Sequence, residues 1–142
     1  NYWVLIFSYP ENSHTEGYRQ EVLNLVNAQR AKYGLTALEM GDDALTAAAQ
    51  TRAEEISVVN SHVRPDGSKC FTVLKDYGVT DTPTGENAAW GSVSPEEVVN
   101  AWMNSEGHRA NILNPEARKM SVGYYYNSNS TWGHQWIQIF TK

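Results

Sequence analysis

The chain has 142 residues, 41% of them hydrophobic, which suits one compact domain with a continuous core and makes a second domain unlikely on size. Its formal net charge of −5, with basic residues dispersed along the chain, provides no electrostatic footprint for nucleic acid or an anionic membrane surface. Cys70 is the single cysteine, which excludes an intramolecular disulfide framework and zinc sites built from two or four cysteines. We expect Cys70 to be a small buried hydrophobic residue.

The N-terminal segment, residues 1–17, starts with the apolar run NYWVLIF and contains Pro10. This run ends at Phe7, far short of the ~20 apolar residues that a membrane-spanning helix needs. The segment has no basic n-region and no small-residue cleavage site, so it does not resemble a secretory signal peptide. Its β-branched and aromatic residues predict an extended segment that adds to a sheet edge or groove. Residues 18–142 are assigned to the folded domain.

The first predicted helix covers the segment EVLNLVNAQRAKYGL. Its apolar residues recur at helical spacing, and Gly34 follows at the position of a left-handed C-terminal cap. The predicted apolar face consists of Val22, Leu25, Val26 and Tyr33.

Two further helices carry clear capping signals. In GDDALTAAAQTRAEEIS, Asp42 or Asp43 is the expected N-cap. The apolar face of this helix contains Leu45, Ala48, Ala49 and Ile56. In SPEEVVNAWMNS, Ser94 is the N-cap, Pro95 occupies the first helical position and Glu97 completes a capping box. We expect Trp102 on its buried face.

The C-terminal segments MSVGYYYN and HQWIQIF are rich in β-branched and aromatic residues and flank the turn-rich stretch NSNSTWG. This arrangement predicts an antiparallel hairpin. The segment NAAWGS predicts a third, short strand after Glu86, preceded by a loop over GVTDTPTGEN.

Four segments carry side chains suited to chemistry. In NSHVRPDGSKCF, the Asp66-Gly67 turn places His62 and Arg64 just beyond the second helix. In TGENAAWG, Gly85 allows an unusual backbone angle beside Glu86 and Asn87. The third segment, SEGHRANIL, predicts a short helix after a break at Gly107, with Ser105 as its cap and His108, Arg109 and Asn111 within it. The fourth segment, WGHQWIQIF, places His134 and Gln135 at the start of a strand.

Two imidazoles and a carboxylate in one cleft would form a site for a divalent ion with a vacant position for water or substrate. The same groups could instead form a hydrogen-bonded cluster that joins three loops without any metal. Both interpretations stay open at this stage.

The ordered motifs VNAQRAKYGLTAL, HVRPDGS, GENAAWG, SPEEVVNAWMNSEGHRANILNP and VGYYYN…WIQIF resemble those of the CAP superfamily in its bacterial branch. This superfamily contains the cysteine-rich secretory proteins, antigen 5 and pathogenesis-related 1 proteins, and its shared unit is also called the SCP domain. The resemblance runs from about Glu21 to Phe140. It implies an α+β fold, a three-layer α-β-α sandwich with a central antiparallel sheet, in an extracellular or cell-surface protein.

The resemblance also implies a cleft. Animal members line it with two histidines and two glutamates, of which His62 and Glu86 match one of each. The other positions fall on Ser105 and Gln135, which are poor zinc ligands, so the bacterial GHR motif places His108 across the cleft instead. We expect a ligand-binding cleft formed by His62, Glu86, Asn87, Ser105, His108, Arg109 and Gln135. His62 and His108 are the metal candidates, for a weakly held divalent ion such as zinc.

Two functions follow from this resemblance. The first is a non-enzymatic domain that binds a small ligand, which would be a lipid, a peptide or a cell-wall fragment. The second is a hydrolase in which a metal-bound water acts, or in which Glu86 is the base and His62 or His108 the acid. The absence of a nucleophile elbow, an HExxH motif and a Cys–His motif favours binding. For Arg109 and Asn111 we expect hydrogen bonds that hold the cleft wall.

Overall fold

The computed structural model describes the backbone of residues 3–142 and the side chains from Thr15 onward. Within this part of the chain the elements follow in the order α1 (Trp3–Lys32), β1 (Glu39–Met40), α2 (Asp43–Ile56), α3 (Thr72–Asp76), β2 (Pro83–Trp90), α4 (Pro95–Met103), α5 (Glu106–Ile112), β3 (Lys119–Tyr126) and β4 (His134–Thr141).

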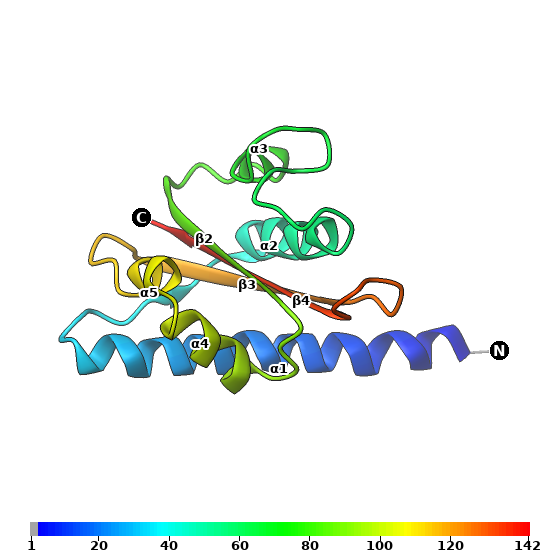
Figure 1. Ribbon diagram of the computed structural model, residues 1–142, viewed down its shortest axis with the longest axis horizontal. Helices are drawn as coiled ribbons and strands as arrows, with labels where there is room; N and C mark the ends of the chain where they lie inside the picture. The colour runs from blue at the N-terminus through cyan, green and yellow to red at the C-terminus, as the bar shows by residue number, and fades with distance from the viewer. Residues whose placement is uncertain (1–2) are drawn as a thin grey trace.

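The strands form one sheet in the order β1-β3-β4-β2. Strands β3 and β4 form the predicted antiparallel hairpin, β2 joins the other side of β4 antiparallel, and only the short β1 runs parallel to its neighbour. Helices α1 and α4 cover one face of the sheet, and α2 and α3 lie on the opposite face (Figure 1). The predicted three-layer α-β-α sandwich is therefore confirmed.

Alternation along the strands divides the core into two halves. On β4, Trp136 and Phe140 pack with α1 and α4, whereas Ile137 and Ile139 pack with α2. These side chains are fully buried, as expected for the central strand of a sheet covered on both faces. Trp102 of α4 is 1% exposed and lies in the first half, as predicted.

The predicted caps explain where α2 and α4 begin. Asp42 accepts a hydrogen bond from the backbone N–H of Leu45 at 3.0 Å, and Ser94 accepts one from the N–H of Glu97 at 3.1 Å. The carboxylate of Glu97 returns to the N–H of Val93, one residue earlier than a standard capping box requires. The sequence therefore located both helix starts correctly.

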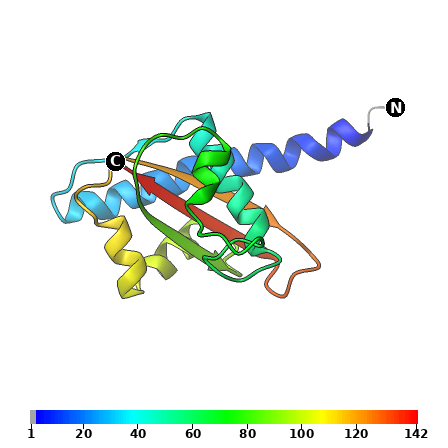
Figure 2. The same cartoon turned by 90° about the horizontal axis from the view of Figure 1, so that it is seen from above.

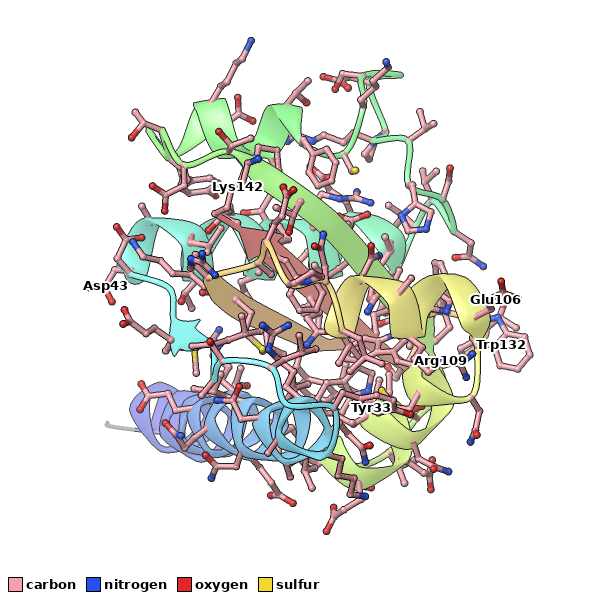
Figure 3. The ribbon with its side chains drawn as sticks, turned by 90° about the vertical axis from the view of Figure 1, so that its left-hand side faces the viewer. Tyr33, Asp43, Glu106, Arg109, Trp132 and Lys142 are labelled. Atoms are coloured by element: carbon pink, nitrogen blue, oxygen red, sulfur yellow. The ribbon has the colours of Figure 1, made fainter. Side chains whose placement is uncertain are left out.

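Three local expectations are wrong. The backbone from Trp3 through residue 17 is part of α1 and not extended, because a helix extends at little cost per residue once its packed portion has formed. The proposed boundary at residue 18 falls inside this helix and stays a prediction. Tyr33, labelled in Figure 3, lies just past the helix end and is 59% exposed instead of packed. Strand β2 begins at Pro83, so the expected loop before Glu86 is shorter.

Candidate functional site

Glu86 lies on β2, an edge strand of the sheet, and its register partner on β4 is Ile139 of the α2-side core. Glu86 therefore faces α2 and is only 6% exposed. Figure 2 shows β2 at the side of the sheet where α4 and α5 lie. An edge strand lacks a neighbour on one side, so segments from both helical layers can approach it. The site forms at this edge for that reason.

Arg52 of α2 holds the Glu86 carboxylate from inside the molecule. Its Nε donates to Oε2 at 2.8 Å and its Nη2 donates to Oε1 at 3.2 Å. The guanidinium also donates to Glu55 at 2.9 Å and to the carbonyl of Ser61 at 3.0 Å, and the Arg52 side chain is fully buried. Arg52 was not among the residues predicted from the sequence, although an arginine on the apolar face of a helix signals a buried anionic partner.

His62 approaches Glu86 from the loop that follows α2. Its Nδ1 lies 2.7 Å from Oε1 of Glu86, and 56% of the His62 side chain remains exposed. The hydrogen bond to Glu86 raises the pKa of His62, although partial burial acts in the opposite direction. Burial also disfavours the charged form of Glu86, but the bonds from His62 and Arg52 outweigh it and lower the pKa of Glu86. The result is an ion pair with one buried and one accessible member.

His108 reaches the same edge from α5, in the other helical layer. Its Nδ1 is hydrogen-bonded to the hydroxyl of Ser105 at 2.9 Å. Burial, followed by the positive charge of nearby His62, lowers the pKa of His108. Ser105 occupies the predicted N-cap position of α5, but its side chain bonds His108 and makes no cap hydrogen bond. The helix break expected at Gly107 occurs earlier in the chain, at Asn104 and Ser105 between α4 and α5. Gly107 itself is within α5.

Cys70 lies against the inner side of this site and is 9% exposed, as expected for a buried residue. Burial and the neighbouring carboxylate of Glu86 raise the pKa of its thiol to about 11. Cys70 is therefore protonated at neutral pH, and a protonated thiol is not a nucleophile.

Two asparagines link β2 to α5. The Nδ2 of Asn87 donates to the carbonyl of His108 and to Oε1 of Gln138, both at 3.1 Å. The Nδ2 of Asn111 donates to Oδ1 of Asn87 at 2.9 Å and to the Glu86 carbonyl at 3.4 Å. Asn87 and Asn111 therefore position the helix that carries His108, which agrees with the wall-holding role expected of Asn111.

Arg109 and Gln135 complete the set of expected cleft residues. Arg109, labelled in Figure 3, donates to the carbonyl of Met103 at 3.1 Å and ties α5 to the end of α4, which is the kind of wall-holding bond expected of it. Gln135 is fully buried, pairs with Trp90 at the other end of β2, and contacts the Ser130 hydroxyl at 2.8 Å. Gln135 lies four positions along β4 from Ile139, the register partner of Glu86, a distance of about 13 Å in a strand.

The structure requires glycine at position 85 for a reason other than the unusual backbone angle expected from the sequence. Its backbone does not have a positive φ, in contrast to glycines such as Gly34. A Cβ at position 85 would lie 2.5 Å from Oδ1 of Asn111. Glycine is therefore required by the close approach of α5 to β2.

Replacing Gly85 with alanine should push Asn111 away and lower the free energy of unfolding by about 1–3 kcal/mol, the usual cost of overpacking. Amide exchange should show the loss of protection concentrated in α5. Gly107→Ala is the matched control, because nothing lies within 4 Å of its added methyl group. Equal exchange protection in the two variants would contradict this account of Gly85.

The stability contributed by His62 should depend on pH. The pKa of His62 is raised above its usual 6.5, so its contribution is complete below pH 6.5 and is lost as pH rises through the raised pKa. The pKa of Glu86 is lowered below its usual 4.5, so its contribution is complete above pH 4.5 and is lost as pH falls through the lowered pKa. The difference in unfolding free energy between wild type and His62→Ala should therefore be largest between pH 4.5 and 6.5. Urea unfolding in chelator-containing buffers measures it, and a difference independent of pH would refute the ion pair.

Comparison with known proteins identifies the family. The model of the cysteine-rich secretory protein family, CAP, matches residues 23–140. The chain belongs to the CAP family. Protein YkwD of Bacillus subtilis strain 168 is 41% identical to this CAP chain over 127 residues, which cover 88% of the chain and 49% of YkwD. The chain thus spans about half the length of this relative.

Solved structures agree with the fold. An extracellular protein containing an SCP domain from Bacillus anthracis str. Ames matches 90% of this CAP chain and 41% of its own, with a TM-score of 0.78 and 26% identity. An outer surface protein from Borrelia burgdorferi matches over 84% of this chain and 88% of its own, with a TM-score of 0.68 and 26% identity. The resemblance inferred from the sequence motifs is confirmed.

Proposed function

We propose that this CAP domain is a binding module whose cleft takes a small ligand, in a protein that is secreted or displayed on the cell surface. The surface location is supported by the extracellular and outer-surface proteins of similar structure. Among the residues that the structure describes, no helix combines the length and apolar character needed to cross a membrane.

The bonding of Glu86 is the observation that carries the proposal. Its Oε1 accepts from His62 and Arg52, and its Oε2 accepts from Arg52. A general base needs a lone pair that a substrate proton can reach. The carboxylate of Glu86 is already engaged by these bonds, and Glu86 is only 6% exposed. The same bonds keep the cleft rigid, which favours recognition over acid–base chemistry at Glu86.

The cleft presents two imidazoles to a ligand. The ring of His62 uses Nδ1 toward Glu86, and the ring of His108 uses Nδ1 toward Ser105, which leaves Nε2 of each ring for a ligand. Such groups recognise polar oxygen and nitrogen atoms. A peptide or a cell-wall fragment therefore suits this cleft better than a lipid does.

A lipid would fit better at a second site, away from the two histidines. A pocket of about 420 Å³ lies beside α3 and the start of β2 and is mainly apolar. Its lining includes Phe71, Leu74, Val79 and Pro83. We therefore treat lipid binding as an alternative outcome located at this pocket.

The weak divalent ion expected from the sequence remains part of this proposal. The Nε2 atoms of His62 and His108 offer two ligands, whereas zinc sites in proteins use three or four, so this pair alone would hold zinc weakly. A bound ion would polarise an oxygen atom of the ligand.

Nuclear magnetic resonance of protein labelled at histidine tests the proposal. Peptidoglycan fragments should shift the ring signals of His62 and His108, and binding should be lost in His62→Ala and His108→Ala. His134→Ala is the matched control, because Nδ1 of His134 bonds the Tyr124 hydroxyl at 2.6 Å on the α1 side of the sheet. Palmitate should leave both ring signals unchanged.

Two results would contradict the proposal. The first is the absence of a shift with any fragment. The second is cleavage of a fragment or of an ester probe that disappears in the same two histidine variants, which would establish the hydrolase alternative instead.

A further inference from the structure

A small hairpin brings Cys70 next to His62. Val63 pairs with Lys69 in an antiparallel bridge, and the Asp66 carboxylate accepts from the N–H of Ser68 at 2.9 Å within the turn. An antiparallel pair at 63 and 69 places positions 62 and 70 opposite each other. The loop geometry therefore sets the imidazole beside the thiol, in a chain with no other cysteine.

Glu86 completes a group of three. One ligand atom each from His62, Cys70 and Glu86, taken as ring nitrogen, Sγ and carboxylate oxygen, lies within 4.8 Å of the other two. His108 is not a member of this group, which is the one such group of three or more among the described residues. The three donors are those that zinc takes in proteins, and three protein ligands leave a fourth position open.

We propose that His62, Cys70 and Glu86 form a thiolate site for a zinc-type ion on the inner side of the cleft. This proposal shares two residues with the binding function above but does not depend on which organic ligand the cleft takes. It differs from the histidine pair expected from the sequence, because Cys70 replaces His108 as the partner of His62.

The surroundings already orient the carboxylate for this role. Arg52 holds Oε2 of Glu86 at 2.8 Å and Oε1 at 3.2 Å, and it also bonds Glu55 and Ser61. The side of Oε1 that now faces Nδ1 of His62 is therefore the side that an ion would use. Hydrogen bonds of this kind orient carboxylate ligands around metals. A zinc ion with the thiolate of Cys70 and the carboxylate of Glu86 is neutral, and the charge of Arg52 stays paired with Glu55 at 2.9 Å.

Loading requires a small movement and the loss of protons. His62 Nδ1 lies 2.7 Å from Oε1 of Glu86, whereas two ligands of a tetrahedral zinc lie roughly 3.3 Å apart. The exposed His62 ring is free of the close packing that would resist this shift. The ion takes the place of the proton between the imidazole and the carboxylate, and Cys70 gives up its S–H proton to solvent.

The thiolate predicts which metals bind. Sulfur ligands favour zinc, cobalt and cadmium over magnesium and calcium, which prefer oxygen. A site built from the two histidines alone would contain no sulfur. The metal preference and the spectroscopic signature of sulfur therefore separate the two arrangements.

Cobalt(II) titration of the whole chain tests the proposal. The wild type should bind one ion per chain and develop the near-ultraviolet sulfur-to-cobalt charge-transfer band, and zinc should displace the ion with loss of the band. Cys70→Ser should abolish the band and weaken zinc binding more than about tenfold, which corresponds to 1.4 kcal/mol. His134→Ala is the matched control and should retain both the band and the affinity, because His134 bonds the Tyr124 hydroxyl and does not belong to the group of three.

A second measurement avoids variants altogether. X-ray absorption at the zinc edge of the zinc-loaded wild-type protein should show one sulfur ligand at about 2.3 Å. A wild-type protein without the cobalt band, or zinc binding that His108→Ala removes and Cys70→Ser leaves intact, would overturn the thiolate site. The second of these results would support the histidine pair.

Discussion

Replacing Glu86 with glutamine is expected to lower the free energy of unfolding by about 3–5 kcal/mol. Glutamine has nearly the same shape but no charge, so the fully buried guanidinium of Arg52 loses its principal anionic partner. Glu55 compensates only in part, because it also binds Arg64 at 2.7 Å. Urea denaturation at pH 7 with a chelator present measures the loss.

Glu116→Gln is the matched control for this substitution. Its partner Lys142 lies 3.0 Å away, but both side chains are about half exposed or more, and such ion pairs contribute about 0–1 kcal/mol. The double replacement Arg52→Met and Glu86→Leu should recover much of the loss, because it removes both buried charges together. A loss in Glu86→Gln as small as that in the control would show that the buried pair is not an important source of stability.

The elements that the sequence predicted well are those set by neighbouring residues. The caps at Asp42 and Ser94 and the alternation in β3 and β4 depend on side chains within a few positions of the backbone they affect. The prediction of an extended N-terminal segment was wrong because the structure of this segment is not set by its own residues. It continues a helix that is packed further along the chain.

The site depended on information that the local pattern does not contain. His62 and Glu86 are 24 positions apart, and only the family resemblance suggested that they meet. Arg52 was missed because its role depends on the opposite strand and not on its helix neighbours. Gly85 was chosen for the wrong reason, since the approach of Asn111 from α5 cannot be seen in the residues around a glycine.

Gln135 shows the limit of transferring positions from the family. It is the second residue of β4, at the position that the resemblance matched to the second histidine of animal members, and it lies on the face of β4 that also holds Ile137 and Ile139. Its contact with Ser130 and its pairing with Trp90 nevertheless place it away from Glu86 along the sheet. A matched position therefore predicted the strand and its face but not membership of the site.

Gly123→Ala is expected to destabilise the chain by about 3 kcal/mol, at the upper end of the usual range for overpacking. Gly123 lies on β3 where α2 packs, and an added methyl group would overlap the backbone carbonyl of Ala49 and lie 2.7 Å from the N of Gln50. Backbone atoms cannot rotate away as a side chain can, so α2 as a whole would have to move from the sheet.

The displacement of α2 should also reach the site, because Arg52 lies on this helix one turn after Ala49. We therefore expect the His62 ring signal to shift in Gly123→Ala, together with the lower midpoint of urea unfolding. Gly17→Ala in α1 is the control, since nothing lies within 4 Å of the new methyl group, and it should stabilise the chain by about 0.5–1 kcal/mol. If Gly123→Ala is as stable as the wild type, the contact between α2 and β3 does not set the position of Arg52, and the rigidity of the Glu86 site must come from the loop around His62 and from α5.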